Sequence, residues 1–309
     1  MMTVKHFLEI SQFDTATLTG ILDSAQAMKD ARIGKDKGII EPDQPLAGKV
    51  LAMVFEKPST RTRVSFDVGM RQLGGQTLVL SSADMQLGRG ESIADTARVL
   101  SRFVDGIMIR TDHNEKLVQL AEYADVPVIN GLTDDSHPCQ IMADMQTLRE
   151  KKGNLADLKI AWLGDFNNVT TSFVHAAGRF GFELDIAFPE NVEPVEETLG
   201  WAQQNDARVT LGHDAVSAVK NADCVVTDTW ISMGDDENQN LHNQFQPFQV
   251  NSALMANAKD DAVFMHCLPA HRNEEVTDEV IDGPQSVAFD EAENRLHAQK
   301  AILKFCMGS

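Results

Sequence analysis

Short apolar runs alternate with longer amphipathic stretches along most of the chain. The run VLAMVF at Val50–Phe55 is continuously apolar, which is typical of a parallel strand buried on both faces. Because helical stretches separate runs of this kind, the pattern predicts βαβ units and parallel sheets. The runs that we predict to be strands are Val50–Phe55, Thr77–Leu80, Ile107–Ile109, Val126–Ile129, Lys159–Leu163, Glu183–Phe188, Arg208–Leu211, Cys224–Thr227, Ala262–His266 and Ser286–Phe289.

The same pattern divides the chain into two parts. We predict a helix over Cys139–Arg149, and the polar residues Lys151–Asn154 after it mark a domain boundary, so the domains are residues 1–150 and 151–309. The end of the chain predicts a C-terminal helix over about 291–309, which we expect to pack back on the first domain. The expected fold class is α/β, with two doubly wound parallel-sheet domains and an interdomain cleft. Ligands of open parallel sheets bind outside the carboxyl ends of the strands.

The charge balance excludes several classes of partner. The chain has 309 residues, with 27 Lys and Arg against 46 Asp and Glu, and a formal net charge of −19. A chain this acidic is repelled by nucleic acids and by anionic membranes.

Its longest strongly apolar run, Val50–Phe55, is far shorter than the roughly 20 residues of a membrane-spanning helix, and the N-terminus has no apolar core of a signal peptide. Four cysteines without a C-x-x-C pair fit a reducing, cytoplasmic location.

The motif STRTR, Ser59–Arg63, follows the first predicted strand and Pro58. Ser59 can cap a helix that begins there, and a helix N-terminus offers free backbone N–H groups to an anion. Arginine adds a planar fork that suits phosphate oxygens. The alternative is an ordinary capped helix with solvated arginines. No G-x-x-x-x-G-K-[ST] pattern occurs, so a nucleoside triphosphate site is not supported.

Two further motifs lie at predicted strand-to-helix junctions. In His137–Gln140, His137 can donate to a carbonyl oxygen and Gln140 can bind an amide, or the segment simply opens a helix with a packed His and Cys. In Gly164–Asn168, a Gly turn ends a strand, but G-x-G-x-x-G is missing, so NAD binding is not expected. The adjacent amides suit a small polar ligand or an Asn-rich turn.

The last two motifs end predicted strands in the second half. Asp228 is well placed to pair with an ammonium group, and the Gly-ended segment after Trp230 suggests a lid. Cys267 could be a nucleophile, a hydrogen-bonding site residue or inert core. His266 and His271 could be metal ligands, although Pro269 between them disrupts helical spacing.

In this order, the motifs closely resemble those of the ornithine carbamoyltransferases. The resemblance rests on Ser-Thr-Arg-Thr-Arg, His-Pro-Cys-Gln, Asp-x-Asn-Asn, Asp-Thr-Trp-Ile-Ser-Met-Gly, His-Cys-Leu-Pro and Glu-Asn-Arg, and it covers essentially the whole chain. It implies a transferase that moves the carbamoyl group of carbamoyl phosphate to L-ornithine, giving L-citrulline and phosphate, in arginine biosynthesis or breakdown. It also implies a homotrimer or a multiple of trimers, with no cofactor and no metal.

The resemblance assigns roles residue by residue. The carbamoyl phosphate residues would be Ser59, Thr60, Arg61, Thr62, Gln86 from a neighbouring subunit, Arg110, His137, Gln140, Cys267, Leu268 and Arg295. The ornithine residues would be Asn168, Asp228, Ser232 and Met233. Of these, Cys267, Arg110 and His137 would be catalytic. Where some relatives carry a Lys in the loop, this chain has Arg89, which could substitute for it. The alternatives are a transcarbamylase with another amine acceptor and a non-catalytic two-domain protein that binds an amino acid or a small anion.

Overall fold

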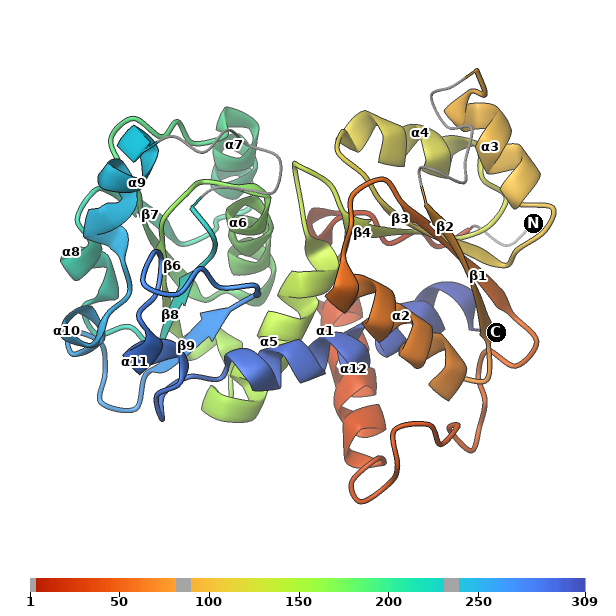
Figure 1. Ribbon diagram of the computed structural model, residues 1–309, viewed down its shortest axis with the longest axis horizontal. Helices are drawn as coiled ribbons and strands as arrows, with labels where there is room; N and C mark the ends of the chain where they lie inside the picture. Colours follow the sequence, from red (N-terminus) through yellow and green to blue (C-terminus); the bar gives the residue numbers. More distant parts are fainter. Residues whose placement is uncertain (1–3, 82–89, 231–238, 309) are drawn as a thin grey trace. The chain divides into compact units, whose positions relative to one another are not determined.

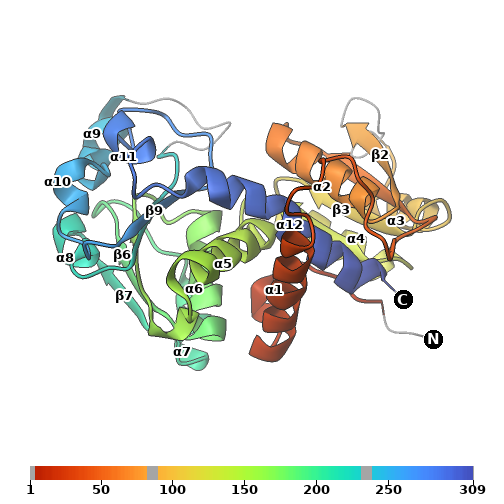
Figure 2. The ribbon, with the colours of Figure 1, turned by 90° about the horizontal axis from the view of Figure 1, so that it is seen from below.

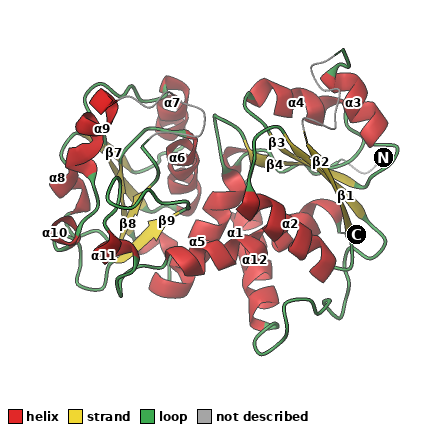
Figure 3. Ribbon diagram, viewed as in Figure 1, coloured by secondary structure: helices red, strands yellow, loops and turns green. Residues whose placement is uncertain are grey.

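The computed structural model describes residues 4–81, 90–230 and 239–308, and it divides into two compact units. Unit 1 comprises Met1–Ala143 and Asn294–Ser309, and unit 2 comprises Asp144–Glu293. Each unit has one parallel β-sheet flanked by helices (Figure 3). The α/β fold expected from the alternating pattern is confirmed.

The sheet of unit 1 has the order β2-β1-β3-β4. Its strands are β1 (Val50–Phe55), β2 (Gln76–Ser81), β3 (Gly106–Arg110) and β4 (Val128–Leu132), and all pairs are parallel. Helices α3 (Ile93–Leu100) and α4 (Asn114–Tyr123) cover one face, and α2 (Thr60–Gln72) lies on the other (Figure 1). Because the chain moves outward in opposite directions from β1 and β3, the topological switch point lies between these two strands.

Helix α2 begins where the sequence predicts it. Ser59 is the N-cap, and its side chain accepts a hydrogen bond from the backbone N–H of Thr62. Phe66, Met70 and Leu73, at helical spacing, are fully buried. The residues of α12 that belong to unit 1 pack against α2, since a Cβ on Gly69 would meet the side chains of Lys300 and Leu296.

The sheet of unit 2 has the order β7-β6-β5-β8-β9, again with parallel pairs. Its strands are β5 (Lys159–Leu163), β6 (Glu183–Ala187), β7 (Val209–Gly212), β8 (Cys224–Thr227) and β9 (Val263–His266). Helices α6 (Asn168–Phe180) and α7 (Glu196–Gln204) lie on one side, while α8 (Ala215–Val219) and α10 (Ser252–Met255) lie on the other (Figures 1 and 2). The switch point of this sheet lies between β5 and β8.

The remaining elements are short, apart from three helices. They are η1 (Ile10–Gln12), α1 (Thr15–Asp30), α5 (Pro138–Lys152), η2 (Leu155–Asp157), α9 (Gln239–Phe245), η3 (Gln246–Phe248), α11 (Asp278–Ile281) and α12 (Ala288–Met307). Within the described ranges, no helix is both long and apolar enough to cross a membrane.

The predicted strand over Ser286–Phe289 is wrong. Ser286 forms a single bridge with Phe264, and α12 already begins at Ala288. The run reads as a strand because Val287 and Phe289 are apolar, but Phe289 is on a helix surface and 62% exposed. A short apolar run does not by itself distinguish a strand from the start of a helix.

Candidate functional site

Two of the sequence motifs and Arg110 lie at the carboxyl edge of the unit 1 sheet. The STRTR motif follows β1, Arg110 ends β3, and His137 comes after β4 and directly before α5. Phe55 at the end of β1 pairs with Arg110. This edge therefore includes the switch point between β1 and β3, which is where open parallel sheets bind ligands.

Helix α2 directs its N-terminus to this edge. Its first residue, Thr60, is exposed, and Arg61 is half-buried, so both are accessible to a ligand. The helix has 13 residues, and the positive end of its backbone dipole lies at the N-cap, Ser59. An anion at this position would be stabilised by the dipole and by unpaired N–H groups of the first turn.

Two buried arginines stand close to the same edge. Arg295 of α12 donates a hydrogen bond from Nη2 to the hydroxyl of Thr62, over 2.8 Å. Thr62 is fully buried, Arg295 is 4% exposed, and Arg110 is 7% exposed. Arginine in a buried position favours planar, charge-assisted contacts with carboxylate or phosphate oxygens, so the pair suits a small anion.

The imidazole of His137 lies within the field of these two arginines. Burial lowers its pKa well below the ordinary value, and the charges of Arg295 and Arg110 lower it further. His137 is therefore neutral at physiological pH and can donate one hydrogen bond to a ligand oxygen. Gln140 follows in the first turn of α5 and is fully buried.

Cys139, between them, belongs to the core. Its Sγ donates to the carbonyl oxygen of Asn130 over 3.2 Å. Burial raises the pKa of this thiol to about 12, so it is protonated at neutral pH.

The second group of predicted residues lies at the carboxyl edge of the unit 2 sheet. Asp228 follows β8, and Asn167 caps α6 just after β5. The Asn167 side chain donates from Nδ2 to Asp228 Oδ2 over 3.0 Å, while its Oδ1 accepts from the backbone N–H of Val169. These residues flank the switch point between β5 and β8, and they form a carboxylate held in a fixed orientation.

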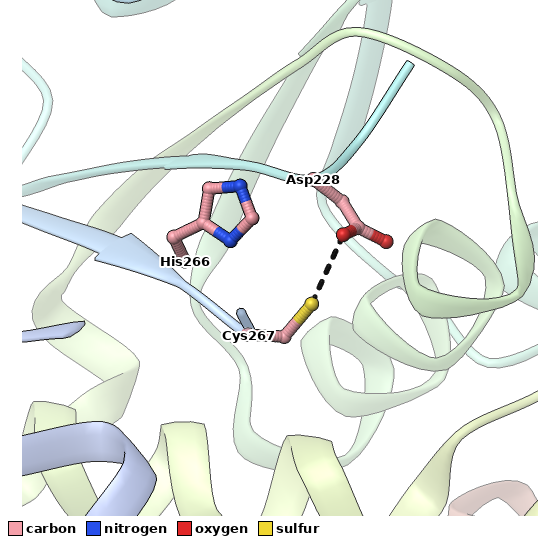
Figure 4. Close-up of side chains that lie close together, drawn as sticks. All are labelled: Asp228, His266 and Cys267. Carbon is pink, nitrogen blue, oxygen red and sulfur yellow. Dashed lines mark hydrogen bonds between the residues drawn. The ribbon is translucent and has the colours of Figure 1, made fainter. Parts of the chain in front are cut away.

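Cys267 completes this group from the end of β9. Its Sγ donates to Asp228 Oδ1 over 3.0 Å (Figure 4). Burial raises the pKa of the thiol well above its usual value, and the neighbouring Asp228 carboxylate raises it further. Cys267 is therefore a protonated hydrogen-bond donor, which disfavours its interpretation as a nucleophile.

The turn after Cys267 is held by side chains that the sequence analysis did not place in the site. Leu268 has φ +58, in the left-handed region that a leucine rarely adopts. Its backbone N–H donates to Nδ1 of His266 over 2.9 Å, so the ring proton of His266 lies on Nε2, which is 3.0 Å from Oε1 of Glu275. The backbone N–H of His266 donates to Glu291. This buried network holds the backbone of the turn that carries Cys267 and Leu268.

The remaining predicted residues include Asn168 and Trp230. Asn167 contacts Asp228, and Asn168 after it begins α6 and is half-buried. Trp230 is 5% exposed and stacks on the ring of Phe245, so its indole packs inside unit 2. The predicted site residues that lie outside the described residues are Gln86, Ser232 and Met233, together with the loop residue Arg89.

Two groups of potential metal ligands occur in the described part of the chain. Asp228, His266 and Cys267 have donor atoms within 4.8 Å of one another, but the hydrogen bonds above already use the thiol and both ring nitrogens. The second group is His271, Glu274 and Glu275.

Comparisons with known proteins agree with this division of residues between the two sheets. Residues 5–150 match the carbamoyl-phosphate-binding domain model of the aspartate/ornithine carbamoyltransferases, and residues 156–306 match the Asp/Orn-binding domain model. Ornithine carbamoyltransferase of Ruegeria pomeroyi is 59% identical over 99% of this chain and 100% of its own length. That of Agrobacterium fabrum is 60% identical over 100% of this chain and 99% of its own length.

A solved structure extends the likeness to the fold. The ornithine carbamoyltransferase from Pyrococcus furiosus superposes with a TM-score of 0.93 at 49% identity, covering 99% of this chain and 98% of that one.

Proposed function

Because the chain belongs to the aspartate/ornithine carbamoyltransferase family, we propose that unit 1 binds carbamoyl phosphate and unit 2 binds L-ornithine. The reaction transfers the carbamoyl group from carbamoyl phosphate to the side-chain amine of L-ornithine and yields L-citrulline and phosphate, in arginine metabolism. In this proposal, residues 1–150 form the carbamoyl phosphate domain and residues 151–309 the ornithine domain, except that the C-terminal helix over about 291–309 packs back on the first domain and brings Arg295 to it.

The observation that carries this proposal is the cationic edge of the unit 1 sheet. The N-terminus of α2, Arg110 and Arg295 supply positive potential at one switch point in a chain whose net charge is −19. A phosphate dianion matches this local charge. In this proposal, the residues that hold the phosphate and carbamoyl groups are Ser59, Thr60, Arg61, Thr62, Arg110, His137, Gln140 and Arg295.

The ornithine side rests on Asp228. Its carboxylate accepts hydrogen bonds from Asn167, Cys267 and the backbone N–H of Thr229, so its position is fixed before any substrate binds. A fixed carboxylate at a strand end suits the α-ammonium group of an amino acid. In this proposal, Asn168, Ser232 and Met233 complete the ornithine contacts, Cys267 would be beside the reacting amine, and Leu268 would contact carbamoyl phosphate.

Chemistry then requires a neutral amine and a stabilised oxyanion. An alkylamine with a pKa near 10.4 must lose a proton at a cost of about 3.3 kcal/mol at pH 8, and desolvation in the site offsets this cost. The amine nitrogen forms a bond to the carbamoyl carbon, and the C–O bond to phosphate breaks. Thr62, Arg110 and neutral His137 donate to the oxygen on which negative charge develops, and each such donor is typically worth about 10²–10³ in rate.

We extend the proposal to the assembly and location of the protein. A homotrimer would let Gln86 of one subunit reach the carbamoyl phosphate of the next, and the reaction would take place in the cytoplasm. The four cysteines are free, three of them buried, which agrees with a reducing compartment.

An acceptor panel tests the proposal. The purified chain is mixed with carbamoyl phosphate and, in separate reactions, L-ornithine, L-aspartate, putrescine or N-acetyl-L-ornithine, and both phosphate and the ureido product are measured. We expect turnover with L-ornithine and none with N-acetyl-L-ornithine, because Asp228 needs a free α-ammonium group. Turnover with another acceptor would identify a different transcarbamylase. Tight binding of both substrates without product would support a binding protein instead.

A further inference from the structure

The turn that follows β9 contains a buried carboxylate, Glu275, and hydrogen bonds reach only one of its two oxygens in the described part of the chain. Glu275 is fully buried, and its Oε1 accepts hydrogen bonds from the backbone N–H of His271, over 2.6 Å, and from Nε2 of His266, over 3.0 Å. No residue in the described part of the chain donates to the other oxygen, Oε2. A buried carboxylate oxygen without a donor is costly, so it indicates that a cation or another donor belongs there.

Potential ligands gather beside this carboxylate. Donor atoms of His271, Glu274 and Glu275 all lie within 4.8 Å of one another. His271 Nδ1 is 3.5 Å from Glu274 Oε2, which is longer than a normal N–H···O hydrogen bond. Zinc ligands at about 2.0–2.1 Å in tetrahedral geometry stand roughly 3.3–3.4 Å from each other, so the observed separation is close to that across a bound ion.

The electrostatics of the cluster favour the same occupant. Glu274 and Glu275 bring two carboxylates together, and His266 has its ring proton on Nε2 and therefore adds no positive charge. The nearest arginine in sequence, Arg272, is engaged by Asp278 and Asp282. A divalent cation bound by Glu274 and Glu275 would neutralise both carboxylates.

We propose that His271, Glu274 and Glu275 form a binding site for a divalent transition-metal ion of the Zn²⁺ class, in addition to the substrate sites. One imidazole and two carboxylates suit Zn²⁺ better than Mg²⁺ or Ca²⁺, which prefer oxygen ligands alone. His242 of α9 places Nδ1 3.6 Å from Oε2 of Glu274 and would orient that carboxylate. An ion at this site would tie α9 to the turn that carries Cys267 and Leu268.

The accessibility of the cluster permits exchange with solvent. The side chains of His271 and Glu274 are 48% and 43% exposed, so an ion can enter from the surface while Glu275 meets it from the interior. The backbone N–H of His271, not its ring, holds Glu275 Oε1, so replacing the imidazole leaves that contact in place.

The test is a Zn²⁺ titration of the full, chelator-treated chain by isothermal titration calorimetry, with the variant His271→Gln. We expect binding to weaken by about tenfold or more in this variant, while carbamoyl transfer by the metal-free protein stays unchanged. His113→Gln is the matched control, because His113 is an exposed histidine 3.8 Å from Asp112 in unit 1. Cys267→Ser is the second control, because it removes the only thiol among the candidate ligands of the described chain.

Both controls should bind Zn²⁺ like the unmodified chain, and the ion should give an anomalous signal between His271 and Glu275 in crystals soaked with Zn²⁺. The proposal is overturned if His271→Gln binds Zn²⁺ as well as the unmodified chain does, if Cys267→Ser abolishes binding, or if the unmodified chain binds with a Kd above about 1 mM. Failure of this test leaves the carbamoyl transfer assay unaffected, so the two results are independent.

Discussion

The hydrogen bond between Thr62 and Arg295 provides a sharp test of the carbamoyl phosphate site. Valine has nearly the shape of threonine but no hydroxyl, so Thr62→Val removes the acceptor that Arg295 Nη2 contacts at 2.8 Å and changes little else. Both side chains are buried, at 0% and 4% exposure, so water does not readily replace the lost oxygen. A buried charged donor without its acceptor costs about 1–3 kcal/mol, which corresponds to a factor of about 5–150.

The measurement is kcat/KM for carbamoyl phosphate at saturating ornithine, with Thr62→Ser as the control that keeps the hydroxyl. We expect Thr62→Val to lower kcat/KM for carbamoyl phosphate by a factor of about 5–150 and Thr62→Ser to keep most of the activity. The KM for ornithine should be unchanged in both variants. Urea unfolding of the two variants separates a loss of stability from a loss of substrate contacts. Values of kcat/KM that agree within about twofold would refute the argument that this contact orients Arg295 for the substrate.

Three further changes probe the rest of the molecule. Asp228→Asn keeps the shape but removes the charge, and should raise the KM for ornithine by about 10- to 100-fold with little change for carbamoyl phosphate, as steady-state kinetics would show. Cys267→Ser should retain measurable activity, because the thiol acts as a donor to Asp228, and a carbamoyl-cysteine adduct found by mass spectrometry would contradict this. Burial, and then the charge of Lys300, lower the pKa of His297 to about 3. From an unfolded value near 6.5, stability is therefore lost as the pH falls below about 6.5, by about 2 kcal/mol at pH 5, and His297→Gln should lose correspondingly less in urea titrations at pH 7 and pH 5.

Local signals in the sequence account for the parts of the site that were predicted. Ser59 after Pro58, followed by apolar residues at helical spacing, predicts the start of α2, and the structure confirms it. By contrast, Glu275 lies nine residues after His266 across an irregular turn, and no periodic pattern links them. Contacts of this kind depend on the path of the backbone after β9, which includes the left-handed Leu268.

The hydrogen bond between Asn167 and Asp228 shows the same limit. Both Asn167 and Asn168 follow the Gly turn after β5, and the sequence alone does not tell which of them caps the helix. The extended backbone of Asn167 makes it the N-cap of α6, and from that position its amide both caps the helix and donates to the carboxylate. A motif therefore predicts that polar side chains gather at the carboxyl edge of a sheet, but it does not predict which of them makes each contact.

The acidity of the chain and its preference for an anionic substrate are compatible because electrostatic interactions are local. At physiological ionic strength, exposed charges more than about 8 Å away are largely screened, whereas buried charges are screened much less. Arg110 and Arg295 are both buried beside His137, whose lowered pKa reflects burial and their combined field. The same field that keeps His137 uncharged would attract a phosphate dianion. The net charge of −19 therefore argues against an extended polyanion such as nucleic acid, but not against a small anion at the edge of a sheet.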